Sequence, residues 1–167
     1  PDQAAPGRSW RPRLLAALDW MDRFGDRDGD GLLEYHRETP TGLVNQGWKD
    51  AADAVFHASG ALATGPIALC EVQGYAWQAR IAAARIARAL DDTETAAVQE
   101  RRAESLRHRF EEAFWCEEIG TYALALDGAK RPCRVRTSNA GQVLLTGLAT
   151  PERARSVADQ LLGRSMF

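Results

Sequence analysis

Apolar residues along most of this chain recur at the spacing of amphipathic helices. A first helix is predicted over residues 10–24, where positions i, i+3, i+4 and i+7 are apolar. Ser9 is placed to cap this helix, and Gly25 is placed to end it. The apolar stripe contains Leu14, Ala17, Leu18 and Met21.

Two longer stripes predict a pair of neighbouring helices. One helix is expected from Pro66 to about residue 90, because proline favours the first helical turn. The other follows the polar run at 91–93, which offers capping oxygens, and is expected to end before Gly120. So short a connection requires the two helices to be antiparallel neighbours. Their stripes contain Val72, Tyr75, Ala76, Ala79, Ala83, Ile86 and Leu90, and then Ala103, Leu106, Phe110, Ala113 and Phe114.

The last third of the chain mixes strand and helix signals. A β-hairpin is predicted from 121–126 and a return at 133–136, with Asp127-Gly128 as its turn. Ser138 is expected to open a short helix, and Thr150-Pro151 supplies the N-cap and first position of a last one. The predicted fold class is therefore all-α, built of antiparallel helical hairpins with short β-hairpins in the loops.

An acidic, glycine-containing segment separates the first helix from the second. Residues 25–31 predict a tight turn, followed by a short strand over 32–35 and irregular structure over 36–65. The run DRDGDG at 26–31 begins like a calcium loop. Its twelfth position is Arg37, however, and not the bidentate glutamate that completes an EF-hand. A tight acidic turn is therefore favoured over a calcium site.

Charge and cysteine content narrow the classes of function. The 167 residues include 21 Lys+Arg and 23 Asp+Glu, a net charge of −2, which gives no electrostatic case for nucleic acid or an anionic membrane. No apolar run is long enough to cross a bilayer. The three cysteines show no close pairing, which favours a reducing, cytoplasmic location over a disulfide framework. The three histidines lack metal-site spacing, so neither a metal nor a cofactor is predicted.

The segment with the clearest chemistry is GLVNQGWKD at 42–50, which sets the Asp50 carboxylate beside the Trp48 indole. An indole face packs against the apolar C–H face of a pyranose, while amides and a lysine hold its hydroxyls. A carboxylic acid partly desolvated by the indole can protonate a glycosidic oxygen. The pattern favours a sugar ligand.

Three further motifs stand in order around this segment: DRDGDGLLEY at 26–35, PIALCEVQGY at 66–75, and RTSNAGQ at 136–142 followed by TGLA at 146–149. Together the four closely resemble bacterial glycogen-debranching-type glycosidases of the amylo-α-1,6-glucosidase group. The resemblance runs from about Leu18 to the last residue. It implies part of an (α/α)6 toroid of twelve helices, with residues 1–167 as a partial catalytic domain and 1–8 as a linker.

The resemblance also implies roles for single residues. Asp50 resembles the proton donor to the departing sugar oxygen, although an aspartate here also suits a helix cap. Glu71 looks like a residue in or near the sugar site, with a solvated carboxylate on a polar helix stripe as the alternative. The other residues expected near substrate are Gln46, Trp48, Lys49, Gln73, Tyr75 and Asn139. For Trp48 a core position, for Lys49 a solvent-facing one and for Asn139 a helix-start role are the alternatives.

The function that follows is an inverting α-glycosidase acting on α-glucosidic bonds of an oligosaccharide or α-glucan. Inversion needs a second carboxylate as base, and the resemblance places that base beyond Phe167, so this segment alone is expected to be inactive. A non-catalytic carbohydrate-binding or helical scaffold module is the alternative. Five helices cannot close a twelve-helix ring, so uncovered helix faces also predict a possible homo-oligomer.

Overall fold

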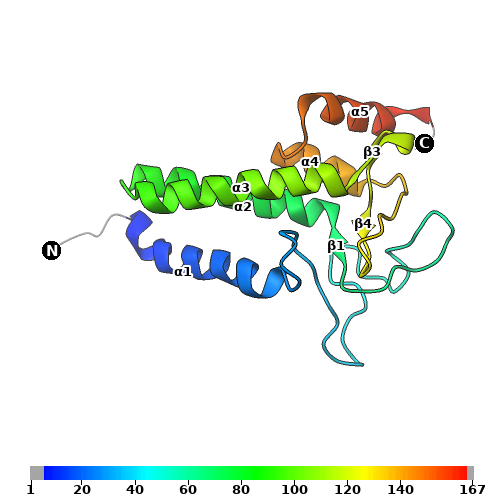
Figure 1. The fold of residues 1–167 in the computed structure, drawn as a ribbon, viewed down its shortest axis with the longest axis horizontal. Coiled ribbons are helices and arrows are strands. Elements are labelled where there is room, and N and C mark those ends of the chain that lie inside the picture. Colours follow the sequence, from blue (N-terminus) through cyan, green and yellow to red (C-terminus); the bar gives the residue numbers. More distant parts are fainter. Residues whose placement is uncertain (1–5, 165–167) are drawn as a thin grey trace.

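The computed structural model describes residues 6–164 and is mostly helical, with helices gathered around one long antiparallel pair (Figure 1). The helices in this part of the chain are α1 (Pro6–Trp20), α2 (Cys70–Ala89), α3 (Thr93–Ala113), α4 (Asn139–Thr146) and α5 (Pro151–Leu162). Four two-residue strands form two antiparallel pairs: β1 (Ala68–Leu69) with β4 (Ala125–Leu126), and β2 (Trp115–Cys116) with β3 (Thr121–Tyr122). The predicted all-α class with small β-pairs is confirmed.

Helices α2 and α3 lie side by side and antiparallel, as their short connection requires (Figure 1). Asp92 caps α3 by accepting a hydrogen bond from the Thr95 amide at 3.1 Å. Arg80 of α2 is buried, and its guanidinium donates to Gln99 of α3 at 3.2 Å and to Asp22 at 2.6 Å. Because Asp22 belongs to the single π-helical turn Met21–Gly25 that extends α1, this arginine joins the first helix to the pair.

The main core fills the space where α2, α3, α4 and the β2–β3 pair meet. Its aromatic centre consists of Phe110, Phe114 and Tyr122. The ring centroid of Phe110 lies 4.9 Å from that of Phe114 and 4.6 Å from that of Tyr122. A smaller cluster under the loops contains Val55, Ile67, Leu69, Leu124, Ala125 and Cys133. The cysteines Cys70, Cys116 and Cys133 are all buried and free. None of the described helices is both long and apolar enough to cross a membrane.

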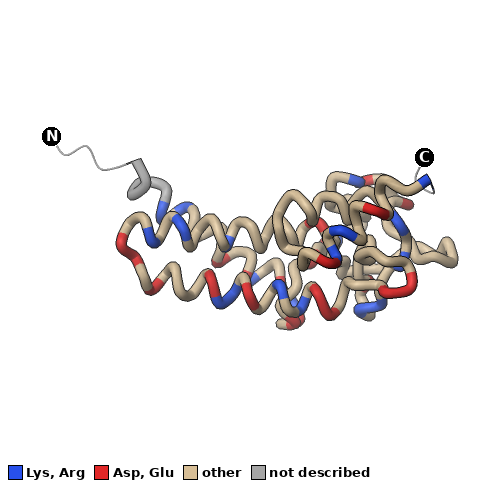
Figure 2. Tube along the Cα trace, turned by 90° about the horizontal axis from the view of Figure 1, so that it is seen from above, with Lys and Arg blue, Asp and Glu red and all other residues tan. Residues whose placement is uncertain are grey.

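Acidic and basic residues are interspersed along the helices and loops (Figure 2). Several of them form surface pairs such as Arg88 with Glu100 at 2.6 Å. Exposed pairs of this kind contribute little to stability, because both partners are already well solvated. Stability must therefore come mainly from the two apolar clusters.

The first helix begins earlier than predicted. Residues 6–9 are already helical, so Ser9 lies inside α1 and is not its cap. Pro6 supplies the alternative start, because proline fits the first turn of a helix. Residues 6–8 of the expected linker are thus helical, whereas residues 1–5 lie outside the described part.

The second helix begins later than predicted, at Cys70 and not at Pro66. The backbone between them pairs with other segments: Ile67 exchanges two hydrogen bonds with Tyr35 at 2.9 and 3.0 Å, and β1 pairs with β4. A helix cannot form where these amides and carbonyls are used in strand pairing. The strand predicted at 32–35 is correspondingly reduced to this one bridge at Tyr35.

The predicted hairpin strand at 121–126 is divided between two partners. Its first part, β3, pairs with β2, and its second part, β4, pairs with β1. No local sequence pattern predicted either pairing. The predicted return pairs only at its first residue, where Cys133 donates to the Ala125 carbonyl at 2.8 Å and accepts from the Leu124 amide at 3.0 Å, next to a bridge between Leu126 and Pro132. The last helix agrees with prediction, since the Thr150 hydroxyl accepts from the Arg153 amide and Pro151 occupies the first turn.

Candidate active site

The loop that carries the GLVNQGWKD motif is fixed from beneath by a buried amide. Asn45 accepts a hydrogen bond from the Tyr35 hydroxyl at 2.8 Å and donates to the Ala51 carbonyl at 2.6 Å, closing the loop across its base. Gly47 packs directly on Leu69, because a Cβ at this position would lie 2.5 Å from the leucine Cδ1. These contacts place Gly47 against the residue before α2 and Lys49 against the start of α4.

Three candidate residues from distant parts of the chain form one hydrogen-bonded chain. Lys49 Nζ donates to Asn139 Oδ1 at 2.6 Å, and Asn139 Nδ2 donates to Glu71 Oε1 at 2.8 Å. Glu71 lies in the first turn of α2 and Asn139 is the first residue of α4, and both are almost fully buried. The alternative of a solvated Glu71 is wrong.

The position of Glu71 has a consequence for its neighbour. The Cys70 thiol is fully buried and lies 3.5 Å from Glu71 Oε2. Burial, together with this carboxylate, raises the pKa of the Cys70 thiol well above its usual value. The thiol is therefore held protonated, as a weak donor to the carboxylate and not as a nucleophile.

Trp48 and Asp50 flank Lys49 on the exposed side of the loop. The indole is 59% exposed, which rules out the core position, and the Lys49 ammonium lies 4.9 Å from its ring centroid. A cation near an indole face is attracted by the ring quadrupole. Asp50 is exposed, and within the described part of the chain its side chain has no hydrogen bond or ion pair. Both side chains are thus open to a ligand.

The remaining candidates differ in what their polar groups do. Tyr75, one turn after Glu71, is 45% exposed, and its hydroxyl donates to Gln142 of α4 at 3.4 Å. Gln73 is fully buried and uses its amide on the backbone, accepting from the Leu33 amide at 2.8 Å and donating to the Leu33 carbonyl at 2.8 Å. Gln46 is exposed and donates to the His36 carbonyl at 3.2 Å.

Gln46 also lines a cleft of about 530 Å³ that runs beside the loop. The exposed rings of Trp20 and Phe24 form its other wall, together with Tyr35. A hollow of about 490 Å³ between α3 and α5 is lined by Arg107, Trp115 and Arg153 and contains none of the predicted site residues. The first cleft, and not the second, borders the candidate site.

Several polar contacts near the site had no sequence signal. His57 Nε2 lies 3.1 Å from the buried carboxylate of Asp127, which ties the loop after residue 50 to the hairpin turn. Burial works to raise the pKa of Asp127, but hydrogen bonds from Arg131 and from backbone amides lower it overall. One carboxylate oxygen of each of Asp26, Asp28 and Asp30 lies within 4.8 Å of the corresponding oxygens of the other two. Among the described residues, these three are the group that could hold a metal ion.

Comparison with known proteins supports a carbohydrate-active function. A family model for the mannosylglycerate hydrolase MGH1-like glycoside hydrolase domain matches residues 3–167. No curated protein matches the chain. The match agrees with the predicted glycoside hydrolase, while the debranching type inferred from the motifs is a finer assignment that the family description does not contain. The chain belongs to the MGH1-like glycoside hydrolase domain family.

Proposed function

We propose that this chain is the acid-bearing part of an inverting glycosidase and that Asp50 protonates the oxygen of the departing sugar. The observation that carries the proposal is the hydrogen-bonded chain from Lys49 through Asn139 to Glu71, which fixes the loop holding Trp48 and Asp50. A general acid must be held within hydrogen-bond reach of the proton acceptor, so a fixed loop with an exposed carboxylate suits the role.

Each group beside Asp50 has a part in binding. The Trp48 indole offers a flat apolar face for a pyranose ring, and the Lys49 ammonium lies close enough to donate to a hydroxyl of a stacked sugar. A sugar ring seated on the indole would remove water from the neighbouring carboxylate. Desolvation favours the protonated form of a carboxylic acid, which is the form that a general acid needs.

Glu71 is assigned a positioning role in this proposal and is not the catalytic base. Its carboxylate is buried and occupied by Asn139 and the Cys70 thiol, so it has no room for the attacking water of an inverting reaction. An inverting pair requires roughly 6.5–9.5 Å between carboxyl groups with water between them. The base is therefore proposed to lie in a part of the toroid outside this chain.

The substrate proposed from the motif resemblance is an α-glucosidic oligosaccharide or α-glucan. The family name points to a second candidate, mannosylglycerate, whose carboxylate would be a partner for the Lys49 ammonium. Hydrolysis of α-glucosides, α-mannosides and mannosylglycerate by the full-length enzyme, with release of the inverted anomer followed by NMR, tests both. Retention of configuration, or no hydrolysis of any of these glycosides, would refute the proposed reaction.

A non-catalytic carbohydrate-binding module is the second candidate, because the exposed Trp48 indole and the Lys49 ammonium beside it can contact a sugar without any catalytic step. Asp50→Asn separates the two functions, since it keeps the shape of the side chain and removes the transferable proton. A glycosidase loses turnover and keeps sugar affinity. If the variant and the wild type are equally active, Asp50 is not the acid.

A further inference from the structure

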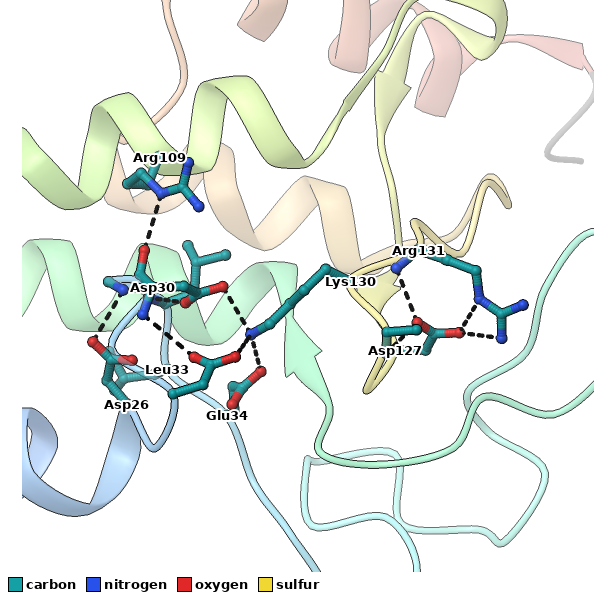
Figure 3. Close-up of polar contacts among 12 residues, drawn as sticks. Asp26, Asp30, Leu33, Glu34, Arg109, Asp127, Lys130 and Arg131 are labelled. Carbon is teal, nitrogen blue, oxygen red and sulfur yellow. Dashed lines mark hydrogen bonds and ion pairs between the residues drawn. The ribbon is translucent and has the colours of Figure 1, made fainter.

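One lysine sits among the carboxylates of the acidic turn, about a hundred residues away from it in sequence. Lys130 Nζ lies 2.9 Å from Asp28 Oδ2 and 2.8 Å from Asp30 Oδ2, and it also contacts Glu34 Oε1. Figure 3 shows the side chain reaching from the hairpin loop into the turn. Its three ammonium protons are thus matched by three carboxylates.

The turn itself has the local geometry of a metal-binding loop. Its carboxylates fold back onto backbone amides: Asp26 accepts from Gly31 at 3.0 Å, and Asp30 accepts from Leu32 at 2.9 Å. Gly29 and Gly31 have φ values of +75° and +86°, which L side chains rarely adopt. The backbone therefore directs one oxygen from each of three aspartates to a common centre.

The turn also holds carboxylate oxygens that the protein does not satisfy. Glu34 Oε2 and Asp26 Oδ1 are buried and have no hydrogen-bond partner within the described residues. The Glu34 side chain is 1% exposed, and it points toward the same ammonium as Asp30 (Figure 3). Three carboxylates thus share a single positive charge, and two buried oxygens of the turn, one on Glu34 and one on Asp26, are left without a partner among the described residues.

The conformation of Lys130 is imposed by the hairpin loop. Buried Asp127 accepts hydrogen bonds from the amides of Ala129 and Arg131, each at 2.9 Å, and from Arg131 Nε at 2.8 Å. The Lys130 amide donates to the Asp127 carbonyl at 2.8 Å, and Lys130 is left with φ of +59°. This left-handed residue is held by its neighbours, and its side chain is aimed at the turn.

We propose that Lys130 is the resident cation of a calcium-type acidic turn, so that its ammonium group orders the turn without a divalent ion. Nitrogen–oxygen distances of 2.8 and 2.9 Å are those of charge-assisted hydrogen bonds, and one ammonium supplies half the charge of Ca²⁺. Removing the ammonium leaves the carboxylates of Asp28, Asp30 and Glu34 around a vacant centre, with an oxygen of Asp26 within 4.8 Å of those of Asp28 and Asp30, and carboxylate oxygens are the ligands that calcium prefers. The site is therefore metal-independent in this chain and becomes a calcium site without Lys130.

The electrostatics of the cluster agree with this role. Burial works against the charge of Lys130, yet its hydrogen bonds to Asp30, Glu34 and Asp28 raise its pKa overall. The hydrogen bond from Lys130 lowers the pKa of Asp28. Burial raises the pKa of Glu34, and the ammonium only partly opposes that shift. The carboxylates thus keep the lysine charged and in place.

The turn is connected to the candidate active site through the backbone that follows it. Leu33 is held by the Gln73 amide, and Tyr35 holds Asn45, which closes the loop of residues 46–50. Lys130 therefore supports the sugar-binding loop from a distance. The loop should therefore be more ordered when a cation, either the ammonium or calcium, occupies the turn.

The test compares thermal unfolding of the wild type, Lys130→Met and Arg134→Met in a calcium chelator and in added calcium. Arg134→Met is the control, because it removes a nearby cation that pairs with exposed Glu118 and does not touch the acidic turn. The wild type and the control should each unfold at the same temperature in both buffers. Lys130→Met should lose roughly 5–10 °C in the chelator. Added calcium should restore most of that loss.

Direct calcium binding, measured by isothermal titration, separates the remaining outcomes. The proposal expects one calcium bound by Lys130→Met, none by the wild type, and much weaker binding when Asp28→Asn is added to the variant. Calcium binding to the wild type at this turn would overturn the proposal, because the lysine would then not replace the ion. A Lys130→Met variant that unfolds at the same temperature in the chelator and in added calcium, or that is unfolded in both buffers, would also overturn the proposal.

Discussion

Asn139 joins Lys49 to Glu71, accepting from the ammonium at 2.6 Å and donating to the buried carboxylate at 2.8 Å. A single amide at the start of α4 thus connects the candidate loop of residues 46–50 to the first turn of α2. Asparagine suits the position because one side of its side chain accepts and the other donates. An aspartate would place a second negative charge against Glu71, and a leucine would satisfy neither neighbour.

Asn139→Leu should therefore lower both stability and sugar affinity. It leaves the buried Glu71 carboxylate without its amide partner, which costs about 1–3 kcal/mol in the free energy of unfolding. Urea denaturation measures this loss, and KM for a glycoside should rise because Lys49 is no longer held. Gln142→Ala is the control on the same helix, since among the described residues the Gln142 side chain has one hydrogen bond, which it accepts from the Tyr75 hydroxyl at 3.4 Å. Equal effects of the two substitutions would argue against a special role for Asn139.

The close approach of α2 and α4 gives a second prediction. A Cβ at Gly74 would lie 2.8 Å from Thr146 Oγ1 and 3.2 Å from its Cγ2. Gly74→Ala should destabilise the chain by about 1–3 kcal/mol, because the helices are already in contact. Thr146→Ala removes both clashing atoms, so the double variant should be more stable than the sum of the single effects predicts. Additive losses in urea unfolding would mean that the contact does not limit the helix spacing.

Alkaline pH should weaken the base of the candidate loop. Burial raises the pKa of Tyr35 to about 12 from its ordinary value of 10.0, so the fold disfavours the phenolate. The contribution of Tyr35 to stability is complete below pH 10 and is lost as the pH rises through about 12. Tyr35→Phe should flatten the fall in unfolding free energy across this window, whereas Tyr75→Phe, which changes a more exposed phenol, should alter it less. If the unfolding free energy of Tyr35→Phe falls with pH as steeply as that of the wild type, ionisation of Tyr35 is not the cause of the alkaline loss of stability.

The uncovered rings of Trp20 and Phe24 predict self-association of this chain. They are 58% and 60% exposed, with ring centroids 6.2 Å apart on neighbouring helical turns. Apolar surface of this kind is normally covered in a closed ring of helices. Sedimentation velocity should show larger species as concentration rises, and Trp20→Ser with Phe24→Ser should abolish them. Leu145→Ser, at a still more exposed apolar site on α4, serves as the control, and a wild type that stays monomeric would rule out this interface.

Local signals predicted those parts of the fold that depend on neighbours in sequence. The caps at Asp92 and Thr150 are formed by side chains that bond to amides three residues away, so the sequence alone was sufficient to place them. Pro66 misled the prediction because a helix start and a strand entry carry the same proline signal. What decided between them was pairing of Ile67 with Tyr35, a contact across 32 residues that no local pattern encodes.

The candidate site shows the same division. The motifs pointed to Lys49, Glu71 and Asn139 separately, but their hydrogen bonds span 68 and 90 residues and required the folded chain. The burial of Glu71 was equally hidden, since its position on α2 also fits a polar stripe. Lys130 could not be found at all, because an isolated lysine in a hairpin loop has no distinguishing sequence context.

The most direct test of the proposed acid is the dependence of Asp50→Asn on the leaving group. With a natural glycoside, kcat should fall by roughly 10²–10⁴ in the full-length enzyme, because no side chain then protonates the departing oxygen. With a glycosyl fluoride, which departs with far less protonation, the variant should recover most of the wild-type rate. Equal impairment on both substrates, or none on either, would contradict the assignment of Asp50 as the general acid.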